Sequence, residues 1–582
     1  MSRTLPVSGP PDRPDVAIHI GGELLSRSIR SDLLRVDVHE EVGRLGRAQL
    51  LLRNWDEEAD RIKHSDEGPF RSGAEVEVQM GYGAELQSVF SGVITGVRGN
   101  FLTGRVPTLE VACRCRGSVL AGPRRSRAFE ETSDLGACRS IAQGAGLEVQ
   151  QGEDGPDHPV LVQWRESAWD YLVRRAHVLG WVLYVRDRTL VFRPPEFGDP
   201  PVATLRWGGN VQELQVGEES FERLEASYRS SWNPASQSPE EGSLEAGREG
   251  SPSGNGESLR QTLDEAGWPD RHERLGQPGP IPPAELEARA RGRMTRESLA
   301  FRSGRGRSLG VPALRIDTLV AIEGVGTRFN GPQYLTAVRH LLDHDRYVTE
   351  FQLGHPPIPS ARPERPGGRA TGVHPAVVTD LDDPEGWGGV RVRFPWLDAD
   401  FPPLRARLGR PDAGGDRGHF FLPEPDDEVL VSFLGGDPRY PVVVGALWNG
   451  SSSPPETATE ENHRRTIVSR EGHRVTFEDG DEAGIVLETS DGRRVRLSDG
   501  SGEIELGDPE GNRILLGADG VTIEAGSGKD VAISAPSGTV ELEGAKLDAS
   551  STGPCSIQSS ATLDLEASAV LGIQGSLVKI NS

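Results

Sequence analysis

Residues 471–480, EGHRVTFEDG, are followed by residues 491–500, DGRRVRLSDG, and by residues 510–517, EGNRILLG. Each copy contains an acidic residue and a glycine, then any residue, an arginine, and two apolar residues separated by one position. Apolar doublets of this kind recur through residues 463–582, about every ten residues for much of the run, and most are separated by Asp-Gly, Glu-Gly or Ser-Gly turns. A short strand with two apolar side chains cannot bury them alone, so the repeats must stack on one another.

The doublet residues are the predicted trimer core of this segment. They are Val475, Phe477, Ile485, Leu487, Val495, Leu497, Ile514, Leu516, Val521, Ile523, Val531, Ile533, Val540 and Leu542. Two architectures fit the pattern: a meander of hairpins within one chain, or a β-helix made by one coiling chain or by three chains wound together. Two apolar side chains per strand favour a narrow core on a shared three-fold axis over a thick sandwich. Closing the sheets around an axis would also remove exposed strand edges.

Composition limits the class of protein. The 582-residue length predicts several domains, and the formal charge of -24 argues against a nucleic-acid partner. Abundant glycine and proline, few aromatic residues and alternating aliphatic residues indicate a mainly β protein with many turns. Four cysteines are too few for a disulfide framework, and Cys113 and Cys115 lack neighbouring ligands, so we expect neither a metal nor a cofactor. The N-terminus lacks an apolar signal-peptide core, which predicts cytoplasmic synthesis and assembly without a signal peptide.

The N-terminal part combines strands with a few helices. Residues 17–120 alternate apolar and polar side chains in the manner of strands. Residues 132–150 are predicted to be helical, and a second helix is expected to begin after Ser167, a capping residue, and to end at Gly180. A further helix is predicted over residues 282–301.

Three segments of the chain are predicted to be irregular. Residues 232–260 are rich in Ser, Gly, Pro and Glu and almost lack hydrophobic residues, which predicts a flexible loop or an insertion. Residues 304–310, GRGRSLG, lack the Gly-Lys-Ser/Thr ending of a phosphate-binding loop and are interpreted as a turn. Residues 355–370 are rich in Pro, Gly and Arg and are interpreted as a linker.

A compact β-rich block follows the linker. Five or so short strands within residues 371–450 suit a small barrel such as an OB-fold. Val390, Val392 and Phe394 alternate with two arginines, so we expect this row of apolar residues to face the core of the barrel.

Several stretches together resemble one protein family. Residues 388–450 contain GGVRVRFPW and DDEVLVSFLGGDPRYPVVVGALWNG ahead of the repeat, and residues 165–194 contain RESAWDYLVRRAHVLGW followed by the hairpin VLYVRDRTLVFRP. These stretches resemble the VgrG-type spike family, which includes the central spike proteins of type VI secretion, of extracellular contractile injection systems and of contractile phage tails.

The resemblance implies a mainly β protein with a two-barrel, phage-hub-like domain over residues 1–370, an OB-fold over 371–456 and a trimeric β-helix spike over 457–582. It implies a homotrimer at the tip of an inner tube, which joins tube to baseplate and punctures a target envelope when a sheath contracts. The expected partners are inner-tube and baseplate proteins, a PAAR-like tip protein, effector cargo and, transiently, the target-cell membrane. The expected spike tip consists of Leu577, Val578, Ile580 and Asn581. The chain would end in an injection particle, which can be extracellular.

Two other functions fit parts of the pattern. A β-helical polysaccharide-degrading enzyme could use paired carboxylates such as Glu503 and Glu505, but strand alternation alone places these side chains on a solvated face. A receptor-binding tail fibre would also use a trimeric β-helix, but such fibres usually carry a globular tip. Only about a dozen residues separate the barrel from the repeat, which leaves no room for a catalytic domain there. We therefore expect no enzyme activity and no catalytic residue.

Overall fold

The computed structural model describes residues 13–218, 226–245, 267, 272–343, 346–355 and 368–580. It forms two compact units, Met1–Ser452 and Ser453–Ser582. Strands hold 43% of the residues and helices 11%, so the predicted mainly β class is confirmed. Within the described ranges, no helix is both long enough and apolar enough to cross a membrane.

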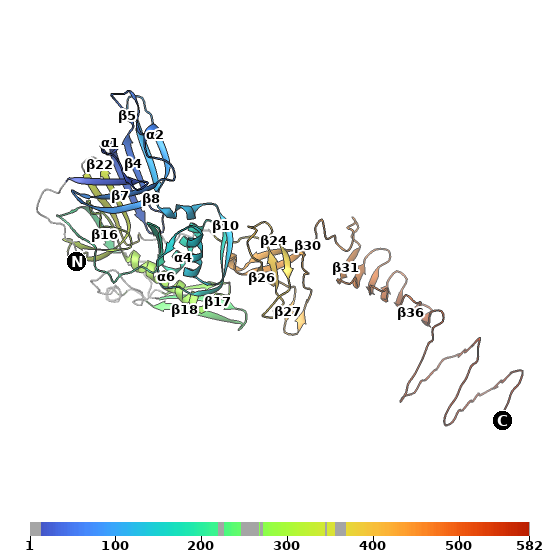
Figure 1. Cartoon of the computed structure of the whole chain (residues 1–582). Helices are drawn as coiled ribbons and strands as arrows, with labels where there is room; N and C mark the ends of the chain where they lie inside the picture. Colours follow the sequence, from blue (N-terminus) through green and yellow to red (C-terminus); the bar gives the residue numbers. More distant parts are fainter. Residues whose placement is uncertain are drawn as a thin grey trace. The chain divides into compact units, whose positions relative to one another are not determined.

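A 13-stranded sheet forms much of the first unit (Figure 1). Its order is β16-β20-β23-β22-β3-β4-β9-β8-β7-β1-β2, with β21 also paired to β22 and β15 to β21. The strands are β1 (Pro14–Ile20), β2 (Glu23–Leu24), β3 (Leu33–Glu41), β4 (Arg47–Arg53), β7 (Glu75–Tyr82), β8 (Glu85–Asn100), β9 (Thr108–Arg114), β15 (Thr204–Arg206), β16 (Val211–Glu218), β20 (Arg302–Leu309), β21 (Leu319–Glu323), β22 (Gly331–Asp343) and β23 (Arg346–Leu353).

Two apolar cores include residues of this sheet. The first includes Val36, Leu50 and Val78, and the second includes Leu205 and Phe351. Inward side chains alternate with partly exposed ones along β3, as one-sided burial of a strand requires. The division of residues 1–370 into two barrels stays a prediction.

The first unit contains further helices and strands outside the large sheet. They are α1 (Arg27–Ser31), β5 (Trp55–Asp56), β6 (Arg61–Ile62), α2 (His64–Glu67), η1 (Arg116–Ala121), β10 (Arg125–Ser133), β11 (Glu148–Val149), β12 (Asp157–Glu166), β13 (Val182–Arg186) and β14 (Thr189–Arg193). β10 pairs with β12, and β13 and β14 form the hairpin expected from the sequence.

The predicted helices are present, and serine caps explain where two of them begin; the one predicted over residues 132–150 ends at Gly144, because Glu148–Val149 form strand β11. Helix α3 (Asp134–Gly144) begins after Ser133, whose hydroxyl accepts a hydrogen bond from the Gly136 backbone N–H. Helix α4 (Ala168–Leu179) is capped by Ser167 and ends at Gly180, which has φ +69°. Helix α6 (Pro283–Phe301) packs against the sheet of β17 (Ala226–Asn233), β18 (Ser238–Glu245) and β19 (His272–Gln277).

One prediction of irregular structure was wrong, and another was wrong for part of its residues. The expected loop over 232–260 contains strand β18, which pairs along its length with β17, while residues 246–260 lie outside the described residues. The expected turn over 304–310 is largely strand β20. A Cβ on Gly304 would lie 2.3 Å from the Gln215 carbonyl oxygen, so this glycine permits close strand packing and marks no turn.

A closed five-stranded barrel ends the first unit and confirms the predicted OB-like fold. Its order is β24-β25-β26-β30-β29. The elements are β24 (His374–Asp380), β25 (Val390–Arg393), β26 (Leu404–Leu408), β27 (Ala413–Gly414), β28 (Arg417–Gly418), β29 (Glu428–Phe433), η2 (Leu434–Gly436) and β30 (Pro441–Leu447). Val390, Val392 and Phe394 are buried as expected. The predicted linker falls mostly outside the described residues, which resume at 368.

The second unit begins with a seven-stranded antiparallel meander. Each strand pairs with the next in the chain: β31 (Arg464–Val468), β32 (Arg474–Glu478), β33 (Gly484–Glu488), β34 (Arg494–Ser498), β35 (Glu503–Gly507), β36 (Arg513–Gly517) and β37 (Gly520–Glu524). Residues 525–580, all described, contain no helix or strand. A single chain therefore adopts the hairpin alternative over residues 464–524, and the winding of three chains stays a prediction.

Candidate functional site: an exposed apolar face

The register of the meander places the predicted core residues on one face. Two rows run across the strands, because each apolar residue lies opposite another apolar residue of the next strand. Row one is Ile467, Val475, Leu487, Val495, Leu506, Ile514 and Ile523. Row two is Arg465, Phe477, Ile485, Leu497, Ile504, Leu516 and Val521. We call these two rows the apolar face.

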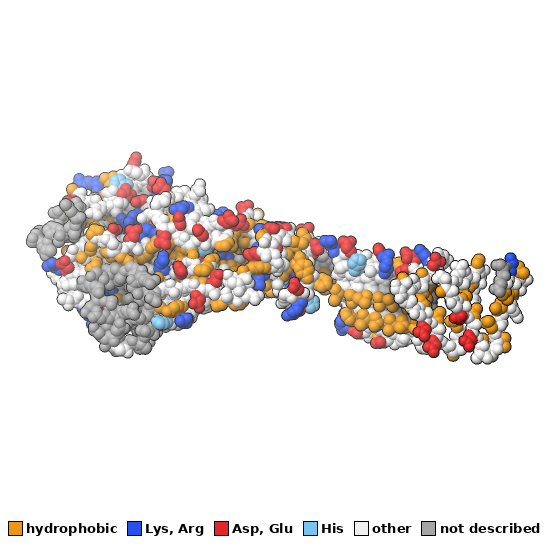
Figure 2. Space-filling view, turned by 90° about the horizontal axis from the view of Figure 1, so that it is seen from below, with side chains coloured by type: hydrophobic (Ala, Val, Ile, Leu, Met, Phe, Trp, Pro, Cys, Tyr) orange, Lys and Arg blue, Asp and Glu red, His pale blue; other side chains and the backbone are white. Residues whose placement is uncertain are grey.

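The apolar face is uncovered in a single chain. Phe477 is 41% exposed, Leu487 45% and Ile523 58%, whereas Thr476, on the opposite face, is 4% exposed. Figure 2 shows apolar side chains gathered into a continuous patch in this part of the chain. Contiguous apolar surface of this kind marks an interaction site, since water opposes its exposure.

Charged residues occupy the opposite face, where they pair between neighbouring strands. Arg494 contacts Glu505 at 3.0 Å, and Arg513 contacts Glu524 at 2.7 Å. Glu505, weighed above as a glycosidase-like carboxylate, is thus held by an arginine of the adjacent strand. Strand alternation places these charges on one face, but that face is not the solvated one expected: Glu505 is only 20% exposed and Thr476 4%.

The sequence prediction missed part of the apolar face. Ile467, Ile504 and Leu506 belong to the two rows but were not among the predicted core residues. The signal for Ile504 and Leu506 was present in EIEL, residues 503–506, where the flanking glutamates fall on the other face.

The remaining predicted residues lie in the tail. Val531, Ile533, Val540 and Leu542 are 49–69% exposed and belong to no strand. The predicted tip residues Leu577, Val578 and Ile580 are likewise exposed, and Asn581 lies outside the described residues. Their place in an assembly stays a prediction.

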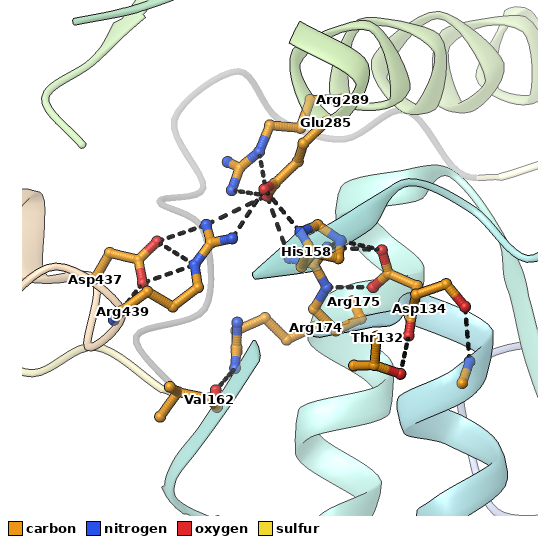
Figure 3. A network of polar contacts seen from close by, with 12 residues as sticks. Thr132, Asp134, His158, Val162, Arg174, Arg175, Glu285, Arg289, Asp437 and Arg439 are labelled. Carbon is orange, nitrogen blue, oxygen red and sulfur yellow. Dashed lines mark hydrogen bonds and ion pairs between the residues drawn. The ribbon is translucent and has the colours of Figure 1, made fainter. Parts of the chain in front are cut away.

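A buried charge network joins the N-terminal part to the barrel (Figure 3). Glu285 of α6 contacts Arg439, which lies between η2 and β30, at 2.8 Å, and His158 of β12 at 3.1 Å. Asp134 contacts His158 at 2.8 Å and Arg175 of α4 at 2.6 Å. These side chains are at most 5% exposed.

The electrostatics of this network keep its carboxylates ionised. Burial raises the pKa of Glu285, but the Arg439 and Arg289 guanidiniums outweigh it and hold that pKa well below its usual value. The pKa of Asp134 is lowered too, because Arg175 and a hydrogen bond from His158 outweigh its burial. Removing one member would leave a buried, unpaired charge, so the network fixes the barrel against α6 and β12.

An aromatic side chain reinforces the same joint. Trp164, from β12, lies within the apolar core of the barrel. Its ring centroid is 5.2 Å from that of Phe433, 5.7 Å from Phe394 and 6.0 Å from Phe401, in edge-to-face arrangements. The barrel core is therefore completed by a residue of the preceding domain.

The cysteines have structural positions. Cys113, Cys115 and Cys138 are buried and free, and burial raises the pKa of Cys113 to about 12 and of Cys115 to about 11. Cys555 is exposed. In the part of the chain that the structure describes, no group of three or more His, Cys, Asp or Glu side chains could hold a metal ion.

Three family models match the chain in order. The Alg8 N-terminal domain matches residues 11–344, the type VI secretion system/phage-baseplate injector OB domain matches 374–448, and the phage baseplate V C-terminal trimerisation domain matches 484–548. The last of these covers strands β33 to β37 of the apolar face.

Parts of the chain are also similar in sequence to curated type VI secretion spike proteins. The type VI secretion system spike protein VgrG2a of Pseudomonas aeruginosa is 34% identical over 120 residues, 20% of this chain and 14% of that protein. The type VI secretion system spike protein VgrG3 of Vibrio cholerae is 30% identical over 105 residues, 16% of this chain and 10% of that protein. The chain thus matches only a small part of the length of these curated relatives.

A solved structure shares the fold. The lidded Francisella PdpA–VgrG complex has a TM-score of 0.51 at 8% identity, over 89% of this chain and 81% of that chain. The Alg8 N-terminal domain model spans more than half of the chain, and the injector barrel and trimerisation domain follow it in the order found here. The chain therefore belongs to the Alg8 N-terminal domain family, and part of it is similar to VgrG-type spike proteins.

Proposed function

We propose that this chain is the structural hub and spike of a contractile injection machine. Three copies form a homotrimer at the tip of an inner tube, join the tube to the baseplate and puncture a target envelope when a sheath contracts. The observation that carries the proposal is the exposed apolar face of β31 to β37, most of which falls within the match to a trimerisation domain. Two further copies of the chain would cover that face.

The geometry suits a part that transmits force. Each strand of the meander is hydrogen-bonded to its neighbours, and three such sheets would bury six apolar rows around one axis. Burying about 25 cal/mol for each Å² of apolar surface would favour this closure strongly. The hub and barrel, locked by Trp164 and by the Glu285–Arg439 pair, would move as one body under load.

The partners follow from this role. We propose that inner-tube and baseplate proteins bind the hub, that a PAAR-like protein covers a tip formed by Leu577, Val578, Ile580 and Asn581, and that effector cargo travels with the spike. The target-cell membrane is contacted only during puncture. The proposed life history begins with cytoplasmic synthesis and ends in an injection particle. The proposed role is mechanical and involves no enzyme activity.

Electron microscopy of contractile particles, labelled with an antibody against the chain, tests the assignment. The label should mark one end of the tube in extended particles and the leading end after contraction. Label distributed along the tube or sheath, or absent from the particles, would refute the proposed position.

A further inference from the structure

The apolar face contains one charged side chain. In the seven described strands, every position of the two rows other than Arg465 carries an apolar residue. Arg465 begins row two, opposite Phe477, on the strand of the meander nearest the barrel in sequence. Its guanidinium donates to the Asp479 carboxylate. The apolar face therefore ends in an ion pair at its N-terminal edge.

The aliphatic rows define the alignment of three chains poorly. Neighbouring strands of a sheet lie about 4.8 Å apart, so sliding one sheet by one strand along the axis would bring similar Val, Ile and Leu side chains together again, except at Phe477. Dispersion and apolar burial are nearly unchanged by such a slip, because neither is directional. A different feature must select one alignment.

We propose that Arg465, held by Asp479, sets the axial register of the three chains in the trimer; this inference rests on the proposed trimeric spike. In register, three Arg465–Asp479 pairs lie at the same level and close one end of the apolar core. After a slip, the whole Arg465–Asp479 pair would lie against apolar rows of a neighbouring chain, and both charged groups would lose water without gaining a new partner. A single polar group in an otherwise apolar interface is a known means of fixing register and copy number.

The occupant of the apolar face at Arg465 is a second copy of this chain, for a reason of continuity. The match to the trimerisation domain begins at residue 484, within β33. The two rows continue without interruption from β33 through β32 to β31. The same interface therefore extends to Arg465, beyond the matched residues.

A second ion pair in the same sheet provides a matched control. Arg513 and Glu524 are 47% and 54% exposed, and Arg465 and Asp479 are 57% and 59% exposed. The two pairs are thus alike in a single chain, where exposed ion pairs contribute little to stability. They lie on opposite faces, so only the Arg465 pair becomes covered when three chains associate.

Charge reversal in the full-length chain separates the two pairs. Arg465→Asp should weaken association by about a hundredfold, because it leaves like charges together in a covered site. Arg513→Asp should weaken it less than about tenfold. The double variant Arg465→Asp with Asp479→Arg should restore association to within about tenfold of the native chain. Sedimentation over a concentration series measures all three.

The register itself needs a separate readout. The double variant Arg465→Leu with Asp479→Leu removes both charges and should associate at least as tightly as the native chain. It should also populate more than one alignment, seen as two or more exchange populations over residues 464–524 in hydrogen–deuterium exchange. A single population in this double variant, or equal effects of Arg465→Asp and Arg513→Asp, would overturn the proposal.

Failure of this proposal can be told apart from failure of the trimeric spike. If Ile523→Asp abolishes association while Arg465→Asp behaves as Arg513→Asp does, the trimer stands and only the role of Arg465 is wrong. If Ile523→Asp also leaves association unchanged, the apolar face is no trimer core and both proposals fail.

Discussion

Replacement of Ile523 by aspartate tests the apolar face at a position that a lone chain tolerates. Ile523 is 58% exposed and lies opposite Ile514 of the adjacent strand. In one chain the new carboxylate stays largely solvated, so we expect little change in the stability of the sheet. In a trimer, three carboxylates would face an apolar core.

The expected loss is large because the change is repeated three times. Burying an unpaired charge costs about 3–5 kcal/mol, and the apolar burial that Ile523 no longer gains costs about 1–1.5 kcal/mol. Three chains then lose about 12–20 kcal/mol. Since about 1.4 kcal/mol corresponds to a tenfold change in affinity, association weakens by roughly nine to fourteen orders of magnitude.

Light scattering at micromolar concentration would detect this change as loss of the trimer. The control is Thr522→Asp, at the preceding residue of the same strand, whose side chain lies on the opposite face. Burial raises the pKa of a carboxyl group above its free value of about 3.9, so acidification from about pH 7 towards pH 4 should restore part of the Ile523→Asp trimer. Equal association of the Ile523→Asp and Thr522→Asp chains would refute the reasoning.

Three further predictions concern the first unit and the cysteines. Burial lowers the pKa of His340 and of His355 to about 4, so the unfolded chain binds protons more readily than the folded one below about pH 6.5. The urea concentration at the unfolding midpoint should therefore decrease as the pH is lowered from about 6.5 to about 4. His340→Gln should make this decrease smaller. Arg439→Met should lower the free energy of unfolding, measured by calorimetry, by about 3–5 kcal/mol, because Glu285 loses a partner. Adding Glu285→Gln to this variant should recover much of the lost stability. An equal loss in the single and the double variant would contradict the pairing. In the dissociated Ile523→Asp chain, one thiol, Cys555, should react quickly with Ellman's reagent, and the other three only after denaturation; a second fast thiol would contradict their burial.

Local patterns predicted the elements that depend on local physics. The helix after Ser167 begins and ends where a hydroxyl cap and a left-handed glycine place its ends. Apolar doublets predicted strands with one buried face, and the registers of β32 to β37 place those doublets in two rows. Such patterns can be recognised in a sequence because each strand or helix buries one face away from water.

Contacts between distant residues could not be predicted in this way. Glu285 and Arg439 are 154 positions apart, and nothing in the sequence around either residue indicates the other. Trp164 looks like an ordinary strand residue, yet it completes the core of a barrel that begins over 200 residues later. The glycines of residues 304–310 indicated a turn, but their role is close packing against strands that only the fold brings near. In each case the role of the residue depends on a contact with a residue that is distant in the sequence.

The mass of the full-length chain in solution tests the central claim most directly. Light scattering coupled to gel filtration should give about three times the chain mass of 62.9 kDa, because two further copies are needed to cover the apolar face of each chain. A mass of 62.9 kDa at micromolar concentration, with residues 464–524 folded, would show that the face stays uncovered and would contradict the trimeric spike.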